Sequence, residues 1–326
     1  MNNIKCAVIG VGYLGRFHAQ KLKQMPGVDL IAVCDINQET ADSVAKELDV
    51  SPCYNFHTLL NDVDAITIAA TTRTHFDIAK ACISAGKHVL IEKPITETVA
   101  QANELIELAK KHKVKLQVGH LERFNSARMA LDDYLDRPRF IESQRIAPYK
   151  PRGTDVNVVL DLMIHDIDIL QSIVKAPIKH IDAQGAPILS QDIDIANARL
   201  HFANGCVANV TASRISFKSE RKTRIFQPNS YISIDYQNKK FAVFEKGTGE
   251  MFPGIPEILR HESCFDKSDA LYEEIASFID CIIYDKQPIV SGEDGCSALE
   301  IASKITLKIN QHLAEIAELS SEGLWN

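Results

Sequence analysis

The sequence lacks the features that mark several large classes of protein. Its 326 residues contain no apolar run near the roughly 20 residues that a transmembrane helix needs. An excess of basic residues is also missing, because the formal net charge is -7, and this disfavours binding along a nucleic-acid backbone. Neither internal repeats nor low-complexity tracts occur. We therefore expect a globular protein with no nucleic-acid partner and no membrane partner.

Metal-binding and disulfide patterns are absent from the eight cysteines. No two of them form a C-x-x-C pair, and no histidine stands at zinc-finger spacing from them. Cys6 and Cys34 fall within apolar stretches, where a thiol packs as a small hydrophobic group. We expect reduced thiols and no metal site. Met1 leads directly into a strand-like segment instead of a signal peptide, which favours a cytoplasmic protein.

The length of the chain exceeds what one hydrophobic core usually organises, so we expect two domains. From residue 4 to 119, short apolar segments alternate with amphipathic stretches, which is typical of a parallel sheet covered by helices on both faces. The predicted strands are Ile4–Ile9, Leu30–Cys34, Ala65–Ala69, His88–Ile91 and Lys115–Val118. Thr98 and Gln101 match a capping box for a helix that runs to about His112.

The pattern changes after residue 124. Strand patterns follow one another from 178 to 244 without intervening helices, which predicts a largely antiparallel sheet. The other predicted elements are helices at 125–135, 158–174, 269–284 and 294–319 and a strand at 140–147. We predict an α/β protein with a parallel-sheet domain at residues 1–120 and an α+β domain, built on a large and mostly antiparallel sheet, at residues 121–326.

A dinucleotide fingerprint follows the first predicted strand. The segment Gly10-Val11-Gly12-Tyr13-Leu14-Gly15 matches G-x-G-x-x-G at the end of a strand and the start of a helix. Gly10 permits a tight turn, Gly12 lets the backbone approach a pyrophosphate, and Gly15 lets helix and strand pack closely. The free N–H groups of the helix N-terminus suit the anion. This order of elements predicts a Rossmann domain.

An acidic residue completes the fingerprint. Asp35 ends the second predicted strand, 20 residues after Gly15, where a carboxylate accepts hydrogen bonds from the adenosine ribose. The segment Ile36-Asn37 supplies no cation for a 2′-phosphate, so the sequence favours NAD over NADP as cofactor. The alternative is a glycine turn that merely links strand to helix, with Asp35 as a surface residue. Strand, helix and acid together favour cofactor binding.

At this point the sequence resembles the Gfo/Idh/MocA family of sugar and cyclitol oxidoreductases over nearly the whole chain. Three motifs carry the resemblance: the glycine loop continued by Arg16-Phe17-His18-Ala19, the segment from Ala85 through Glu92-Lys93-Pro94, and Asp161-Leu162-Met163-Ile164-His165. The 161–168 segment and the Val118–Phe124 junction also resemble a branch of nucleotide-sugar 3-dehydrogenases. The family pattern has glycines before the Asp and one glycine two residues after it, whereas this chain has Asn157-Val158-Val159-Leu160 and Met163.

The resemblance implies roles for individual residues. Lys93 would contact the nicotinamide and the reacting hydroxyl, and Asp161 and His165 would face the substrate as further catalytic residues. The cofactor would be bound by Gly10, Gly12, Tyr13, Leu14, Gly15, Asp35, Thr71, Thr72, His75, Glu92 and Lys93. The family often holds the Lys93-Pro94 bond cis. It also commonly associates through the second-domain sheet, which implies a homodimer or homotetramer.

The predicted helix 158–174 supports these roles independently. Asp161, His165, Asp168 and Ser172 fall within about 60° of one another around a helix. Apolar residues occupy nearly every other side, so the helix should be buried. A polar stripe on a buried helix must face a cleft or find partners, because unpaired buried carboxylates are costly. The alternatives are a stripe that meets water or a structural Asp–His pair. Asp168 would support the other two from one turn away.

Two cationic segments are further candidates. Arg145, Tyr149, Lys150 and Arg152 precede the apolar helix and are candidate substrate contacts. The cluster Arg214, Lys218, Arg221, Lys222 and Arg224 stands out in an acidic protein and could meet phosphate. For the cluster we favour a solvated hairpin without a ligand.

These features predict an NAD-dependent oxidoreductase. It would transfer hydride between the nicotinamide and a ring secondary alcohol of a small-molecule substrate: a sugar, a cyclitol or a nucleotide sugar such as UDP-N-acetylglucosamine. His165 would accept the hydroxyl proton, Lys93 would hydrogen-bond the developing alkoxide, and Asp161 would orient the hydroxyl or His165. The alternatives are a non-catalytic NAD-sensing regulatory protein of the same fold and an NAD-dependent glycosidase.

The cofactor preference can be tested directly. NAD should bind at least about tenfold more tightly than NADP, because Asp35 would meet the added phosphate with like charge and lose its ribose hydrogen bonds. Asp35→Ser should narrow the gap. Calorimetric titration of both cofactors measures the difference, and equal dissociation constants in the unmodified protein would contradict the prediction.

Overall fold

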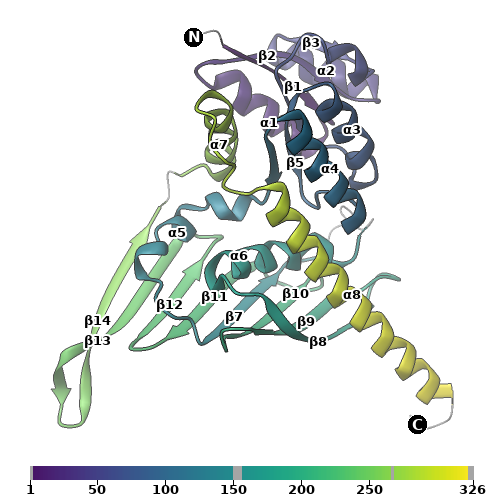
Figure 1. The fold of residues 1–326 in the computed structure, drawn as a ribbon. Helices are drawn as coiled ribbons and strands as arrows, with labels where there is room; N and C mark the ends of the chain where they lie inside the picture. The colour runs from purple at the N-terminus through teal and green to yellow at the C-terminus, as the bar shows by residue number, and fades with distance from the viewer. Residues whose placement is uncertain (1–2, 150–155, 266–267, 322–326) are drawn as a thin grey trace. The chain divides into compact units, whose positions relative to one another are not determined.

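The computed structural model describes residues 3–149, 156–265 and 268–321. These residues form two compact units: the first combines 1–124 with 269–299, and the second combines 125–268 with 300–326. The sequence had suggested a division at residue 120 alone. The segment 269–299 returns to the first unit, where its helix α7 (Ala270–Ile283) packs beside α1 (Tyr13–Gln24) (Figure 1). Apolar residues of α7 and α1 share one buried cluster with residues of β1 (Ile4–Ile9).

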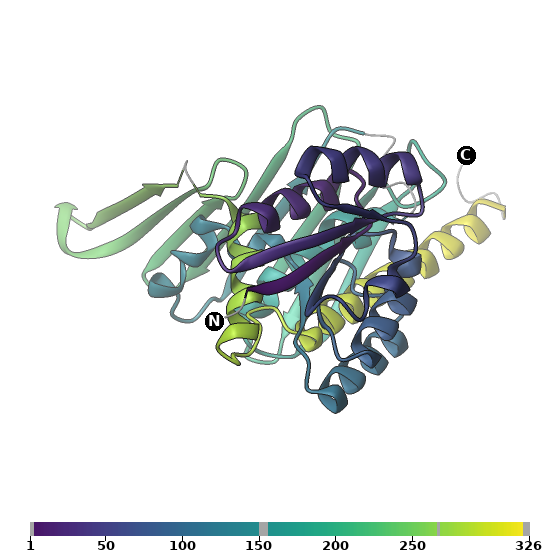
Figure 2. The same cartoon turned by 90° about the horizontal axis from the view of Figure 1, so that it is seen from above.

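The first unit is built on a six-stranded parallel sheet with the order β3-β2-β1-β4-β5-β6. The strands are β1 (Ile4–Ile9), β2 (Val28–Cys34), β3 (Ser51–Cys53), β4 (Ala65–Ile68), β5 (His88–Glu92) and β6 (Leu116–Gly119). Helices α1 (Tyr13–Gln24) and α2 (Gln38–Leu48) cover one face, and α3 (Thr72–Ser84) and α4 (Val99–His112) cover the other (Figure 2). This strand order confirms the predicted Rossmann domain.

Local sequence signals explain several of these elements. Each residue of β4 is buried, and β1 ends on four consecutive buried residues, as expected for strands covered on both faces. The Thr98 side chain accepts a hydrogen bond from the Gln101 amide, and the Gln101 side chain accepts one from Thr98, which confirms the predicted capping box of α4. The C-cap of that helix, Lys113, adopts the left-handed conformation.

The second unit is built on an eight-stranded sheet with the order β14-β13-β12-β11-β7-β10-β9-β8. Its strands are β7 (Phe140–Ile146), β8 (Ile178–Ala186), β9 (Ile195–Phe202), β10 (Val207–Ser213), β11 (Glu220–Gln227), β12 (Ser230–Asp235), β13 (Lys240–Phe252) and β14 (Ile255–Cys264). Neighbouring strands are antiparallel except for β7 and β10, which run parallel. The predicted large, mostly antiparallel sheet is confirmed.

Helices complete the second unit. Helix α6 (Ile164–Val174) lies across one face of the sheet (Figure 1). It is preceded by a π-helical turn at Val159–Met163, so the predicted helix 158–174 is present but is not a uniform α-helix. The final helix, α8, runs from Gly292 to Ser321 and passes from the first unit into the second. No helix in the described ranges is long and apolar enough to cross a membrane.

The predicted helix at 125–135 is wrong in its extent. The structure has a short helix α5 (Ser126–Met129) and a separate 3-10 turn at Asp132–Tyr134. Tertiary contacts oppose a continuous helix, because Asn125 caps α5 and also donates to the Tyr236 carbonyl at 3.0 Å. The Arg128 guanidinium likewise bridges to Ser172 on α6 at 3.0 Å.

The capping box provides a stability prediction for the first unit. Thr98→Ala should lower the free energy of unfolding by about 1 kcal/mol, because the first turn of α4 loses a hydrogen-bond acceptor. Thr98→Ser is the matched control, since it retains the hydroxyl and should stay near the unsubstituted protein. Urea unfolding followed by circular dichroism measures both. Equal losses in the two variants would show that the hydroxyl does not cap the helix.

Candidate active site

The glycine loop brings α1 directly onto the end of β1. Gly10 has φ +82°, and a Cβ atom on it would lie 2.5 Å from the Ala70 nitrogen. A Cβ atom on Gly15 would lie 1.8 Å from the Gly10 carbonyl oxygen, so only glycine fits there. A Cβ atom on Gly12 would meet no atom within 4 Å. Gly10 and Gly15 therefore shape the turn, and Gly12 leaves open space beside the helix N-terminus.

That open space fits a pyrophosphate. Helix α1 has Gly12 as its N-cap, without a side-chain cap and without an acidic residue in its first turn, so no side chain of the helix itself competes with an anion for its N-terminal N–H groups. Tyr13 and Leu14, in the first turn, are 71% and 36% exposed. Ile36, after β2, is 93% exposed. Exposed apolar side chains around a polar loop are typical of a surface that a ligand covers.

Asp35 lies at the carboxyl end of β2, beside the glycine loop. Its Oδ2 accepts the Val11 amide at 3.0 Å, and its Oδ1 accepts the Asn37 amide at 2.9 Å. Each carboxylate oxygen can accept a second hydrogen bond, so the group retains capacity for ribose hydroxyls. The bond to Val11 also ties the acid to the loop that would carry the pyrophosphate.

Thr71, Thr72 and His75 follow β4. Thr71 is the N-cap residue of α3, without a side-chain hydrogen bond to the helix, and Thr72 is the first residue of that helix. His75 is only 1% exposed, and its ring nitrogens lie 2.9 Å from the Pro94 carbonyl and 3.0 Å from the Ala70 carbonyl. Burial lowers the pKa of His75, whereas the contacts with the Pro94 and Ala70 carbonyls act in the opposite direction. The ring lies between the loop after β4 and the loop after β5.

Glu92 and Lys93 end β5. The Lys93-Pro94 peptide bond is cis, as the family resemblance implied. Lys93 is half-buried. Glu92 is 8% exposed, and its Oε1 lies 2.9 Å from His18 Nε2. The Glu92 carboxylate therefore points into the core, although it was predicted as a cofactor contact.

Asp161 and His165 belong to the second unit. Asp161 lies in the π-helical turn, and His165 follows in the first turn of α6; both are half-buried. Single π-turns in helices occur frequently at functional sites. Asp168, one turn further, is 2% exposed. Lys93 lies in the other unit, so the convergence of the three catalytic candidates stays a prediction.

The cationic candidates of the second unit mostly have structural partners. Arg145 is 3% exposed and binds Asp166 at 2.7 Å, so the substrate contact predicted for Arg145 is replaced by a buried ion pair. Tyr149 is 39% exposed. Lys150 and Arg152 lie outside the described residues.

The second cationic cluster contains one buried arginine and several residues that are at least partly exposed. Arg214 is buried and binds Asp194 at 2.8 Å, where hydrogen bonds from Ser190 and Arg214 lower the pKa of Asp194 despite its burial. Lys218 is exposed and pairs with Glu220 at 2.9 Å, which agrees with the expected solvated hairpin. Lys222 and Arg224 also have acidic neighbours, Glu220 and Glu142, at 3.7 Å and 3.3 Å.

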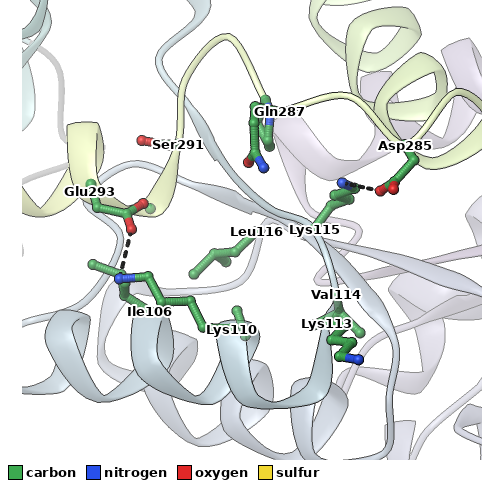
Figure 3. A pocket seen from close by; sticks show the side chains of 13 residues that line it. Ile106, Lys110, Lys113, Val114, Lys115, Leu116, Asp285, Gln287, Ser291 and Glu293 are labelled. Atoms are coloured by element: carbon green, nitrogen blue, oxygen red, sulfur yellow. Dashed lines mark hydrogen bonds and ion pairs between the residues drawn. The ribbon is translucent and has the colours of Figure 1, made fainter.

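A pocket of about 540 Å³ lies elsewhere in the first unit (Figure 3). The end of α4, the start of β6 and the segment 285–293 line it. Its Lys110 contacts Glu293 at 3.1 Å and its Lys115 contacts Asp285 at 2.6 Å, so carboxylates already neutralise both cations. None of the predicted site residues line this pocket.

Comparisons with known proteins agree with the geometry. The oxidoreductase family with an NAD-binding Rossmann fold matches residues 4–120, and the GFO/IDH/MocA C-terminal domain matches residues 115–230. The chain is 36% identical to UDP-N-acetylglucosamine 3-dehydrogenase of Acidithiobacillus ferrooxidans, over 96% of this chain and 99% of that protein. A solved structure of that enzyme superimposes with a TM-score of 0.90 over 95% of this chain and 98% of that chain.

More distant relatives are also dehydrogenases. A scyllo-inositol 2-dehydrogenase (NAD(+)) of Bacillus subtilis is 28% identical, with 94% of each chain covered. The parallel sheet, the glycine loop and these matches define an NAD-dependent oxidoreductase. The chain belongs to the Gfo/Idh/MocA family. The predicted family, enzyme class and NAD cofactor are thereby confirmed.

The glycine loop generates a test of cofactor binding. Gly12→Ala should fold normally, because its Cβ atom meets open space, but it should weaken NADH binding by about tenfold or more by occupying the path of the pyrophosphate. Fluorescence titration measures the affinity for NADH, and the melting temperature without cofactor shows whether the variant folds normally. Unchanged affinity would remove Gly12 from the cofactor site, whereas Gly15→Ala should already disturb the fold.

Proposed function

We propose that this enzyme oxidises a ring secondary alcohol of a nucleotide sugar, with UDP-N-acetylglucosamine as the first candidate substrate. The observation that carries the proposal is the 36% identity, over nearly the full length of both chains, to a dehydrogenase of that name. The inositol dehydrogenases are less similar, at 27% and 28% identity. A cyclitol is therefore the second choice within the same chemistry.

The cofactor site lies at the carboxyl ends of β1, β2, β4 and β5. Gly10, Gly12 and Gly15 with the first turn of α1 bind the pyrophosphate, and Asp35 accepts the ribose hydroxyls. Thr71 and Thr72 line the next turn of the site. His75 has an indirect role, because its buried ring lies between the carbonyls of Ala70 and Pro94 and supports the loops that follow β4 and β5. NAD, when bound, supplies the nicotinamide carbon that accepts or returns hydride.

Three side chains of this protein handle the proton. Lys93, at the end of a parallel strand, donates a hydrogen bond to the hydroxyl oxygen as negative charge develops on it. His165 accepts the hydroxyl proton, since an imidazole titrates near neutral pH. Asp161 orients the hydroxyl or His165. The half-buried positions of Asp161, in the π-helical turn, and of His165, in the first turn of α6, support this assignment, because most of this helix is buried.

We also propose that the enzyme is cytoplasmic and forms a homodimer or homotetramer through the eight-stranded sheet. A row of aromatic rings crosses neighbouring strands, with centroid distances of 5.7 Å for Phe140–Phe226, 5.1 Å for Phe226–Tyr231 and 5.5 Å for Tyr231–Phe244. Phe226 is 37% exposed. Such a row on a sheet face suits association, and sedimentation of the purified protein tests it.

The catalytic assignment predicts a kinetic phenotype without a structural one. Lys93→Ala, Asp161→Asn and His165→Ala should each lower turnover by on the order of 100-fold or more while NAD binding and melting temperature are retained. The substrate is first identified by screening UDP-sugars, sugars and inositols for the absorbance of NADH. Near-normal turnover in His165→Ala would exclude it as the base.

The same screen separates the alternatives. NAD binding without turnover on any alcohol would favour an NAD-sensing protein. Release of a leaving group with catalytic amounts of NAD would favour a glycosidase. Accumulation of NADH with UDP-N-acetylglucosamine, and much less with inositols, is the result expected for the proposed function.

A further inference from the structure

A buried group of titratable side chains lies beneath Lys93 in the first unit. It consists of His18 from α1, Glu92 from β5 and Glu274 from α7, and one polar atom of each lies within 4.8 Å of the others. Their exposures are 0%, 8% and 0%. Helix α7 brings Glu274 to this place because it packs beside α1 and β5 (Figure 1). The proposed chemistry uses neither His18 nor Glu274.

The fold makes room for the Glu92 carboxylate. Gly119 is the register partner of Glu92 on the neighbouring strand β6. A Cβ atom on Gly119 would lie 2.9 Å from the Glu92 carboxyl group, so any larger residue would displace it. The absence of a side chain at residue 119 thus creates the space that the acid occupies.

The Glu92 carboxylate connects two parts of the cofactor site. One oxygen lies 2.9 Å from His18 Nε2, on the helix that follows the glycine loop. The other accepts the backbone N–H of Lys93 at 3.2 Å. Hydrogen bonds to an ionised acceptor are stronger than neutral ones, and a buried one is little screened. The Lys93 backbone is therefore held against α1 through a single side chain.

Glu274 has a different environment. Neither of its carboxyl oxygens has a hydrogen-bond partner among the described residues. Burial, together with the nearby charge of Glu92, raises the pKa of Glu274 well above its usual range. Burial alone would also raise the pKa of Glu92, but the hydrogen bond and charge of His18 and the charge of Lys93 lower it. Burial and the Glu92 charge thus favour the neutral form of Glu274, and the His18 contact favours the ionised form of Glu92.

We propose that His18 and Glu92 are positioning residues for Lys93, and that Glu274 is a neutral carboxylic acid behind them. The proposal rests on the proposed function in giving Lys93 the reactive role. Lys93 must place its ammonium group accurately, since small displacements of a reacting group can cost about 100-fold in rate. Glu92 and His18 fix the peptide from which that side chain extends.

A divalent cation is the competing occupant of the cluster. One histidine nitrogen and two carboxylates are possible metal ligands. A cation would have to replace the 2.9 Å hydrogen bond between His18 and Glu92, which already satisfies both atoms. The observed bond therefore favours the metal-free arrangement, and metal content becomes one outcome of the test.

The matched pair Glu92→Gln and Glu274→Gln separates the two roles by the same chemical change. Glu92→Gln removes the anionic acceptor, so kcat should fall by about 10- to 100-fold while KM for NAD changes little. The Lys93 backbone amide should also exchange its hydrogen for deuterium faster, because it loses its anionic acceptor. Glu274→Gln replaces a neutral acid by a neutral amide and should leave kcat and exchange near those of the unsubstituted enzyme. Equal losses of kcat in both variants would overturn the proposal.

The neutral state of Glu274 is tested without turnover. Its pKa is raised on folding, so its contribution to stability is greatest below the unfolded pKa and is lost as pH rises. The melting temperature of the unsubstituted enzyme minus that of Glu274→Gln should therefore fall between about pH 5 and pH 8. Other groups face the cluster: Glu92 and Lys93 at the end of β5, His18 from α1, and His120, whose pKa burial lowers to about 3. They are present in both proteins, so only the part of their titration that depends on Glu274, chiefly that of Glu92, remains in the difference.

The remaining outcomes are distinct. A pH-independent difference in melting temperature would show that Glu274 is charged and would overturn the neutral-acid assignment. Stoichiometric metal in the purified protein, lost in Glu274→Gln, would replace the proposal by a cation site. A lack of turnover on every alcohol would count against the proposed function alone, because amide exchange and melting temperature still test the cluster.

Discussion

The close contact between the start of α1 and the end of β1 is the constraint on which the first unit depends. With a Cβ atom on Gly15 the helix would collide with the Gly10 carbonyl oxygen, at 1.8 Å. The contact sets the helix N-terminus at the carboxyl end of the central strand. Parallel strands bring all their carboxyl ends to the same edge, so Asp35, His75 and Lys93, which follow different strands, lie along that edge of the sheet.

In each unit, at least one buried acidic side chain lies against a basic partner. Asp166 binds Arg145, Asp194 binds Arg214, and Glu92 binds His18. A buried charge without a partner would cost several kcal/mol, so each pair constrains the elements that carry it. The first pair joins α6 to the sheet through β7. The Asp166–Arg145 pair therefore anchors the helix at the residue directly after His165.

The polar groups of α6 divide between structure and chemistry according to burial. Asp166 and Asp168 are 0% and 2% exposed, whereas Asp161 and His165 are half-buried. Ser172 accepts from Arg128 and donates to the Ile169 carbonyl, so it belongs to the structural set. Helical periodicity alone predicts that Asp168 and Ser172 share one face with Asp161 and His165. The π-turn and the neighbouring elements separate them.

The Rossmann domain, its glycine loop, the α4 cap and the antiparallel second sheet could be predicted from the sequence, because each depends on local pattern or backbone geometry. Glycine spacing, strand length and a capping box act within a few residues of the chain. Tertiary structure alone decided that residues 269–299 rejoin the first unit and that Arg145 is buried against Asp166. It also decided that Glu274 meets His18 and Glu92. These contacts join segments far apart in the chain, and no local pattern encodes which buried charge will meet which partner.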